Sequence, residues 1–368
     1  MRYGHGGDIY TNQGIRLDFS INVNPLGMPD FVKRAAEESI AFCGHYPDPG
    51  CGRLRRAAAE RYQVGEETLI FGNGAAELIF TSVQALRPAS AVLMAPGFTE
   101  YEDALKTVGA KLDFFYLKEK DGFELKTERY LEFLEERKPE LIFLCNPSNP
   151  LGKALEAKAG SQILEYCREH NIFVIADECF LEFLPEAKAR SFLAEVRRGN
   201  KGLLVLKALT KTFAMPGLRL GYGFCADRQL LDRIECLLQP WNVSIPAQEA
   251  GTAAFSGNME GFLFETIRLL STERPFLIET MAAAGFQTFS PEGNFILFRD
   301  LPGRPAHRLY QDLLEQGILI RSCGNFRGLG GTYYRICVRR RKENAELLQA
   351  LDTAADKGKC AVINDGPL

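Results

Sequence analysis

The sequence lacks three features that would place it in a specialised class of protein. It has no apolar run near the 18 residues of a membrane-spanning helix, and the segment that follows Met1 has no apolar core like that of a signal peptide. It has no C-x-x-C pair, because the two closest cysteines, Cys43 and Cys51, are eight residues apart. It has no excess of positive charge, since 44 Lys and Arg against 47 Asp and Glu give a net charge of −3.

Each absence excludes a class of function. Without an overall positive charge, the protein has no general attraction for nucleic acid or for an anionic membrane surface. The cysteine spacing predicts neither a metal site nor a redox pair, so we expect the ten cysteines to be reduced and mostly buried. The sequence therefore predicts a cytoplasmic protein that binds no nucleic acid, no membrane and no metal.

What is present is typical of a globular enzyme. Hydrophobic residues make up 46% of the chain and charged residues 25%, which are ordinary values for a soluble protein. At roughly 150 residues per domain, a chain of 368 residues has room for about two and a half domains. This predicts two domains or one large α/β unit.

The centre of the chain alternates short apolar runs with longer amphipathic stretches such as 76–86 and 157–170. Strands that are almost continuously apolar are typical of a parallel sheet covered by helices on both faces. We therefore predict one large α/β domain over residues 41–250, with a mainly parallel sheet. Its seven expected strands are 68–71, 91–95, 112–117, 141–145, 172–176, 203–206 and 220–224.

After residue 250 the pattern changes. A helical region, 245–284, precedes three expected strands at 293–298, 317–321 and 333–338. This spacing predicts a smaller α+β domain formed by 251–368 together with residues 1–40. The last stretch, from Lys357 onward, is expected to be frayed.

The segment from the strand at 203–206 to Gly221 is the most informative for chemistry. Lys211 follows the strand, and Arg219 lies in a Gly-Leu-Arg-Leu-Gly sequence that enters the next strand. Both are equally compatible with ordinary surface cations. The functional alternative is a lysine that forms an imine with an aldehyde cofactor, with Arg219 at the cofactor's phosphate, because a guanidinium matches phosphate geometry.

Three other segments place polar groups directly after apolar strands. Asp177 ends the strand at 172–176, where ligands bind in α/β sheets, although it is also compatible with a turn cap. Asn149 lies in a proline-containing loop after the strand at 141–145, which alone indicates only a turn. Gly74 lies between an expected strand and the start of an expected helix. The backbone N–H groups at such a helix start can bind a phosphate, although a tight turn explains the glycine equally well.

In this order, these segments resemble those of fold-type I enzymes of the class I and II aminotransferase family, which use pyridoxal 5′-phosphate (PLP). The resemblance extends from His5 to about Leu351. It implies a large PLP-binding domain, a small domain built from both chain ends, and a homodimer with shared sites. It implies that Lys211 binds the cofactor's aldehyde and that Asp177 holds its pyridine nitrogen. Further implied cofactor contacts are Gly74, Ala75, Ala76, Phe98, Asn149, Thr210, Arg219 and, from the partner subunit, Tyr46.

The resemblance also implies a substrate site. Arg335 matches the family's arginine for an anionic substrate group, and Arg321 matches a second one. Buried arginines without a ligand are costly, so two of them in apolar strands favour an anionic substrate. These cations are expected to form a positive pocket together with Lys211 and Arg219. The full set of implied substrate contacts is His5, Gly6, Asn24, Asn149, Arg321 and Arg335.

Within the family, the sequence is most similar to the threonine-phosphate decarboxylase branch of cobalamin biosynthesis and to the histidinol-phosphate aminotransferases. The opening His5-Gly6-Gly7-Asp8 resembles the decarboxylases, although a terminal histidine is usually unconstrained. The expected reaction is decarboxylation of O-phospho-L-threonine to (R)-1-amino-2-propanol O-2-phosphate. Transamination of histidinol phosphate or another amino acid, and a non-catalytic PLP-binding module, are the alternatives.

Three residues differ from the usual family pattern, and one of them is Leu151, which replaces the usual threonine before Gly152. Ala208 stands where relatives commonly have a serine or threonine that contacts the cofactor phosphate. Its absence removes one hydrogen bond, worth about 1 kcal/mol. Phe180 stands where most aminotransferases have a tyrosine that donates to the cofactor's phenolic oxygen.

Overall fold

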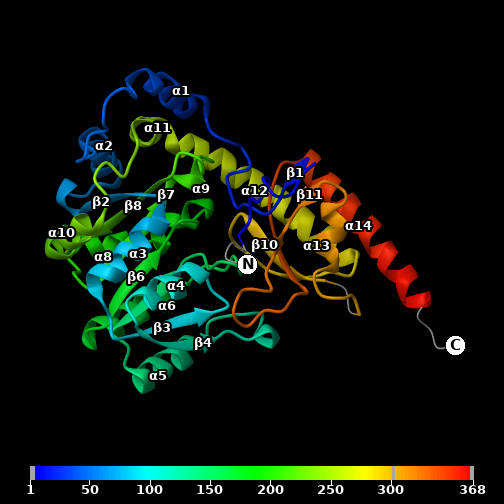
Figure 1. The fold of residues 1–368 in the computed structure, drawn as a ribbon. Coiled ribbons are helices and arrows are strands. Elements are labelled where there is room, and N and C mark those ends of the chain that lie inside the picture. The colour runs from blue at the N-terminus through cyan, green and yellow to red at the C-terminus, as the bar shows by residue number, and fades with distance from the viewer. Residues whose placement is uncertain (1–4, 301–302, 365–368) are drawn as a thin grey trace.

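The structure, a computed structural model, describes residues 5–300 and 303–364, with side chains as far as residue 355. Its centre is a seven-stranded sheet in the order β2-β8-β7-β6-β5-β3-β4, in which β8 alone runs antiparallel to its neighbours (Figure 1). This confirms the predicted fold class and all seven expected strands. They are β2 (Leu69–Asn73), β3 (Ser90–Ala95), β4 (Lys111–Tyr116), β5 (Leu141–Cys145), β6 (Phe173–Asp177), β7 (Leu203–Ala208) and β8 (Leu220–Cys225).

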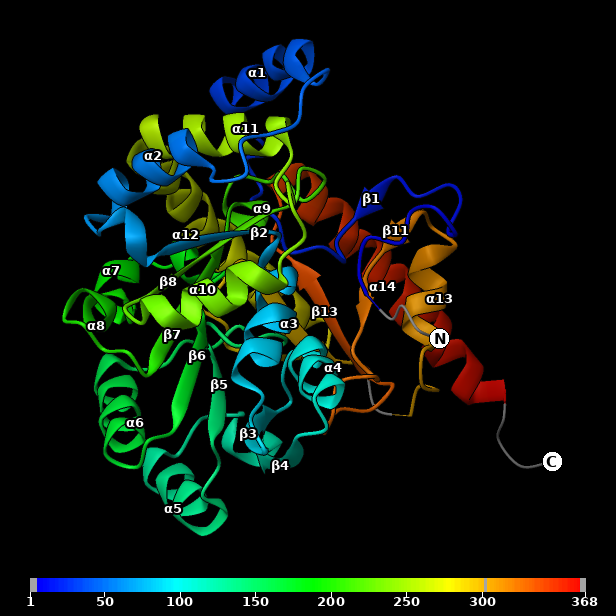
Figure 2. The same ribbon diagram turned by 60° about the vertical axis from the view of Figure 1, so that its left-hand side comes forward.

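Helices cover both faces of this sheet, because alternate residues of each strand point to opposite faces. In β5, Ile142 and Leu144 pack into one core cluster, whereas Leu141 and Phe143 pack into another. The first face is covered by α2 (Gly52–Tyr62), α5 (Thr127–Arg137), α6 (Ala157–Glu169), α8 (Leu193–Arg197) and α11 (Ile245–Ser256), and the second by α3 (Ala75–Leu86), α4 (Thr99–Thr107) and α10 (Arg228–Leu237) (Figure 2).

A second, antiparallel sheet lies beside the first, in the order β12-β13-β10-β9. Two of its strands are those expected at 293–298 and 333–338. The strand expected at 317–321 is divided, because Ile318–Leu319 pairs with the N-terminal Leu17–Asp18 and only the part from Arg321 joins this sheet. The strand β9 was not expected. The sheet packs against three helices that share its core. The elements are β9 (Gln287–Phe289), β10 (Phe295–Arg299), β12 (Arg321–Ser322), β13 (Tyr333–Cys337), α12 (Met259–Ala283), α13 (Arg308–Leu314) and α14 (Arg341–Asn364).

The N-terminal segment contacts both parts of the molecule. β1 (Leu17–Asp18) pairs in parallel with β11 (Ile318–Leu319), beside the second sheet. α1 (Asp30–Ser39) instead lies along α11, at the upper left of Figure 1. The division into a domain of 41–250 and one of 1–40 plus 251–368 stays a prediction.

Two expectations about helices were wrong. The helical region at 245–284 is two helices, because the chain leaves the helix at Gly257 and the Asn258 side chain caps α12 by accepting a hydrogen bond from Gly261 N at 2.9 Å. The region expected to fray from Lys357 is helical as far as Asn364. None of the helices among the described residues is long and apolar enough to cross a membrane.

A buried ionic cluster fixes the ends of β6 and β7. The amine of Lys207 lies 3.1 Å from Glu178 and 2.9 Å from Glu182, and Lys207 is 3% exposed. Glu178 also accepts hydrogen bonds from Ser191 Oγ at 2.6 Å and from Phe192 N at 2.7 Å. The nearby carboxylates raise the pKa of Lys207 although burial opposes them. Two carboxylates and one ammonium are therefore held together beside Asp177.

Replacing Lys207→Met should destabilise the fold, because it leaves the buried Glu178 and the partly buried Glu182 without their cation. Loss of one partner from a buried ion pair costs about 3–5 kcal/mol. We expect the midpoint of urea unfolding to fall clearly, whereas Lys201→Met, at an exposed position, should leave it unchanged. Equal midpoints for the two variants would show that the cluster does not stabilise the fold.

Candidate active site

The predicted polar residues meet because three parallel strands end at one edge of the sheet. In the β5–β6 register Cys145 lies opposite Asp177, and Asp177 lies opposite Leu206 of β7. Asn149 lies in the loop after β5, and Lys211 lies on α9 (Leu209–Thr212), directly after β7. The same edge thus presents an amide, a carboxylate and an amine.

These residues line a cavity of about 420 Å³, called the site cavity below. The arginines of the second sheet reach it from the opposite side. It is also lined by Ala208 and Phe180, two of the three residues that differ from the usual family pattern. Of the predicted site residues, the site cavity is lined by His5, Gly6, Ala75, Ala76, Phe98, Asn149, Asp177, Thr210, Lys211, Arg219, Arg321 and Arg335.

Asp177 is buried, and both of its carboxylate oxygens accept a hydrogen bond. Tyr101 Oη donates to Oδ2 at 2.7 Å, and Cys179 N donates to Oδ1 at 3.0 Å. Burial raises the pKa of Tyr101 well above its ordinary value, so the phenol stays a donor. Sequence analysis missed Tyr101. Its position three residues after Phe98 could have indicated it, because residues at this spacing lie on the same face of a helix. The ring centroids of Phe98 and Tyr101 are 5.4 Å apart.

Lys211 lies in a positive, water-poor setting. Burial and the charges of Arg335 and Arg219 together lower the pKa of its amine to about 8, while Cys179 and Asp177 oppose them. An amine with this pKa has a sizeable neutral fraction near physiological pH, whereas an ordinary lysine has almost none. Lys211 is therefore suited to nucleophilic attack on a carbonyl and to proton transfer.

The two arginines of the second sheet are direct neighbours, because Arg321 of β12 pairs with Arg335 of β13. Arg335 Nη1 donates to Asn149 Oδ1, and Nη2 donates to Ser20 O at 3.0 Å. Its Nε is buried and has no hydrogen-bond partner among the described residues. Burial lowers the pKa of Arg335 to about 10 and also lowers that of Arg321. The positive charges of both guanidinium groups are thus only partly balanced by their neighbours, as expected where an anion binds.

The start of α3 packs closely against Arg219. Gly74 has φ +79°, and a Cβ at this position would lie 2.4 Å from Arg219 Nη2. A Cβ on Gly221 of β8 would lie 2.2 Å from Ala75 N. The guanidinium and the first backbone N–H groups of α3 are therefore adjacent at the site cavity, an arrangement that suits a phosphate.

Three predicted residues, Gly74, Asn24 and Tyr46, do not line the site cavity. Asn24 donates from Nδ2 to Thr212 O at 2.9 Å and to Thr266 Oγ1 at 2.8 Å, so its amide fixes the turn that carries Lys211. Asn22 lines the cavity instead, and its buried Oδ1 has no partner among the described residues. Tyr46 is 76% exposed and stacks on Trp241 with ring centroids 4.4 Å apart.

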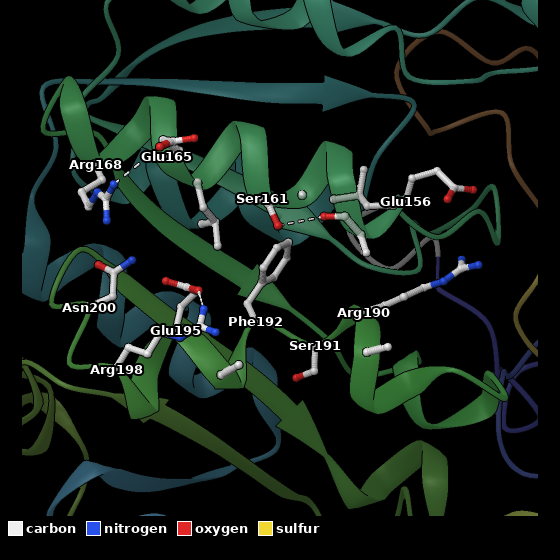
Figure 3. A pocket seen from close by; sticks show the side chains of 16 residues that line it. Glu156, Ser161, Glu165, Arg168, Arg190, Ser191, Phe192, Glu195, Arg198 and Asn200 are labelled. Carbon is white, nitrogen blue, oxygen red and sulfur yellow. Dashed lines mark hydrogen bonds and ion pairs between the residues drawn. The ribbon is translucent and has the colours of Figure 1, made fainter.

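A second pocket of the same volume, about 420 Å³, lies between α6 and α8 (Figure 3). Its charged side chains pair with one another, as between Arg168 and Glu165 and between Arg198 and Glu195. None of the predicted site residues lines it. The chemistry of the lining, rather than the volume, therefore identifies the site cavity.

Removing the charge of Arg335 should raise the pKa of Lys211. We expect Arg335→Met to move the apparent pKa of the Lys211 amine from about 8 toward the ordinary value of 10.5. Modification of Lys211 by an amine-specific reagent, measured by peptide mass spectrometry in cofactor-free protein, should then begin at higher pH. Arg268→Met, at an exposed position, is the control. An unchanged labelling profile in Arg335→Met would contradict this electrostatic account.

Comparison with known proteins agrees with this geometry. The profile of the family described as aminotransferase class I and II matches residues 15–351. The chain is 37% identical to a threonine-phosphate decarboxylase of Salmonella typhimurium over 94% of this chain and 95% of that protein. The crystal structure of the histidinol-phosphate aminotransferase from Clostridium acetobutylicum superposes with a TM-score of 0.85 at 30% identity, covering 93% of this chain and 99% of that one.

A second solved structure is that of L-threonine-O-3-phosphate decarboxylase from Porphyromonas gingivalis. It superposes with a TM-score of 0.79 at 26% identity, covering 92% of this chain and 99% of that one. The family profile covers most of the chain, and the similarity extends over nearly the whole length of each relative. The chain therefore belongs to the class I and II aminotransferase family.

Proposed function

We propose that the protein is a PLP-dependent decarboxylase that converts O-phospho-L-threonine to (R)-1-amino-2-propanol O-2-phosphate in cobalamin biosynthesis. The observation that carries this choice is the position of His5 and Gly6 in the wall of the site cavity, beside Arg321 and Arg335. The cavity thus offers an extra anion-binding group from the segment that resembles the decarboxylases. The 37% identity to the Salmonella enzyme supports the same reaction.

The residues present fit the cofactor. The Lys211 amine has a lowered pKa, as binding an aldehyde requires. Gly74 leaves space that a Cβ would fill against Arg219, so a phosphate has access to the guanidinium and to the N–H groups of Ala75 and Ala76. Asp177 would hold a protonated pyridine nitrogen, and Phe98 would pack against the ring, since both side chains line the site cavity. When bound, PLP supplies an electron sink for the pair that remains on Cα.

The protein's own groups then orient the substrate and move one proton. The cations Arg321 and Arg335 and the imidazole of His5 are available to bind the phosphate and the carboxylate. The Cα–carboxylate bond breaks, CO₂ leaves, and the Lys211 ammonium delivers a proton to Cα. Tyr101 keeps the Asp177 carboxylate oriented throughout, because it stays protonated. The orientation of the carboxylate, rather than these shared groups, decides between decarboxylation and transamination.

We further infer that the protein acts as a homodimer in the cytoplasm. Tyr46, Trp241, Ile40 and Phe42 are large hydrophobic side chains that are 47–76% exposed, and Tyr46 does not line its own chain's cavity. A second copy of the chain would cover them, and Tyr46 would reach the partner's phosphate site. The nine cysteines whose side chains the structure describes are all free, which suits a reducing compartment.

Product analysis tests the reaction. Protein loaded with PLP should release CO₂ from O-phospho-L-threonine without any 2-oxo acid, and Lys211→Ala should release none. Turnover that requires an added 2-oxo acid would establish the aminotransferase instead. Absence of both reactions in protein that binds PLP would support a non-catalytic module.

Mixing two inactive variants tests the shared site. Lys211→Ala lacks the amine, and Tyr46→Ala lacks the contact expected from the partner. In a mixed dimer, one of the two sites has both groups intact, so random exchange of subunits should restore about a quarter of the wild-type activity. Activity that does not rise above that of the separate variants, in dimers shown to exchange, would contradict a Tyr46 contribution in trans.

A further inference from the structure

A carboxylate lies among the cations of the site cavity and is not used by the proposed reaction. Glu100, in the first turn of α4, lines the cavity with Arg321 and Arg335. Burial raises the pKa of Glu100, and the charge of His5 opposes this effect. A carboxylate in this position repels an anionic substrate, so its presence requires a compensating role.

The partner of Glu100 is His5. Glu100 Oε1 lies 3.2 Å from His5 Nδ1, and the His5 and Glu100 side chains are 52% and 15% exposed, respectively. This contact joins the N-terminal segment to α4 across the edge of the site cavity. Because Glu100 engages Nδ1, it leaves Nε2 of the imidazole available to another acceptor.

The backbone next to His5 is already fixed. A Cβ on Gly6 would lie 2.2 Å from Ser20 O, and Gly7 N donates to Ser20 Oγ at 2.7 Å. The remaining freedom at the cavity edge is therefore rotation of the His5 side chain. Glu100 limits that rotation through the contact with Nδ1.

We propose that Glu100 is a positioning residue that holds His5 through Nδ1, so that Nε2 donates a hydrogen bond to the phosphate of the substrate. This inference rests on the proposed function for the identity of the phosphorylated ligand. In this arrangement the imidazole ring of His5 has one orientation, and Glu100 maintains it.

Binding of O-phosphoethanolamine tests the proposal apart from the reaction. This amine has the phosphate but no carboxylate, so it cannot be decarboxylated. In PLP-loaded protein, we expect Glu100→Ala to weaken its binding about tenfold, the size of one charge-assisted hydrogen bond, measured by calorimetry. Glu100→Gln, which keeps an acceptor for Nδ1–H, should recover part of the loss. Asp103→Asn, an exposed carboxylate on the same helix, should have no effect.

The decisive comparison uses a His5→Asn background. There, Glu100→Ala should leave binding unchanged or make it tighter, because only the repulsion of the ligand by Glu100 remains. An equal loss in both backgrounds would show that Glu100 supports the fold rather than His5 and would overturn the proposal. Binding of L-threonine, which lacks the phosphate, should be insensitive to Glu100→Ala, and an equal tenfold loss there would also contradict the role.

The outcome is separable from that of the proposed function. In the decarboxylation assay, Glu100→Ala should raise KM for O-phospho-L-threonine about tenfold and leave kcat nearly unchanged. If the protein releases no CO₂ but Glu100→Ala weakens the binding of O-phosphoethanolamine only when His5 is present, the inference about Glu100 stands and the proposed reaction does not. If CO₂ is released but Glu100→Ala weakens binding equally in the wild-type and His5→Asn backgrounds, the proposed reaction stands and the inference about Glu100 does not.

Discussion

The whole site depends on the low-water, positive environment of the Lys211 amine. An ordinary lysine is fully protonated near neutral pH, whereas burial and the charge of Arg335 lower the pKa of Lys211 to about 8. The elements that create this environment come from distant parts of the sequence. The lysine follows β7, whereas Arg335 lies on β13 in the second sheet. Neither sheet alone provides a reactive amine.

The same arginine links substrate binding to the contact between the two sheets. Arg335 donates to Asn149 from the loop after β5 and to the carbonyl of Ser20 in the N-terminal segment. A ligand anion at Arg335 therefore meets a guanidinium whose position is fixed from both sides. Asn24 adds a second link, because it ties the N-terminal segment to the turn of Lys211 and to α12. Fixed donors of this kind are already oriented when the substrate binds.

Much of the fold and part of the candidate site could be predicted from the sequence. Near-continuous apolar runs identified all seven central strands, because a strand buried on both faces has no polar side to interrupt the run. Lys211, Asp177 and Asn149 followed from their positions directly after such strands. Arg321 and Arg335 were expected from the family resemblance, and the structure places them side by side.

What could not be predicted depends on contacts between segments that are distant in sequence. Asn22 and Asn24 are two residues apart in one extended segment. The positions of Thr212 O and of Thr266 on α12 decide that the amide of Asn24 makes hydrogen bonds within the fold. The bond from Tyr101 to Asp177 spans 76 positions, and the pairing of Glu100 with His5 spans 95. Local patterns do not specify such pairs. The break between α11 and α12 does have a local signal, Ser256-Gly257-Asn258, which the expectation of one helical region did not use.

The central claim is that Lys211 is the one residue that carries the cofactor at the meeting point of the two sheets. Reduction of PLP-loaded protein with borohydride, followed by peptide mass spectrometry, tests it most directly. Our account predicts a stable cofactor adduct on the peptide containing Lys211 and its loss in Lys211→Ala. An adduct on Lys207 or on a surface lysine, with Lys211 unmodified, would contradict it.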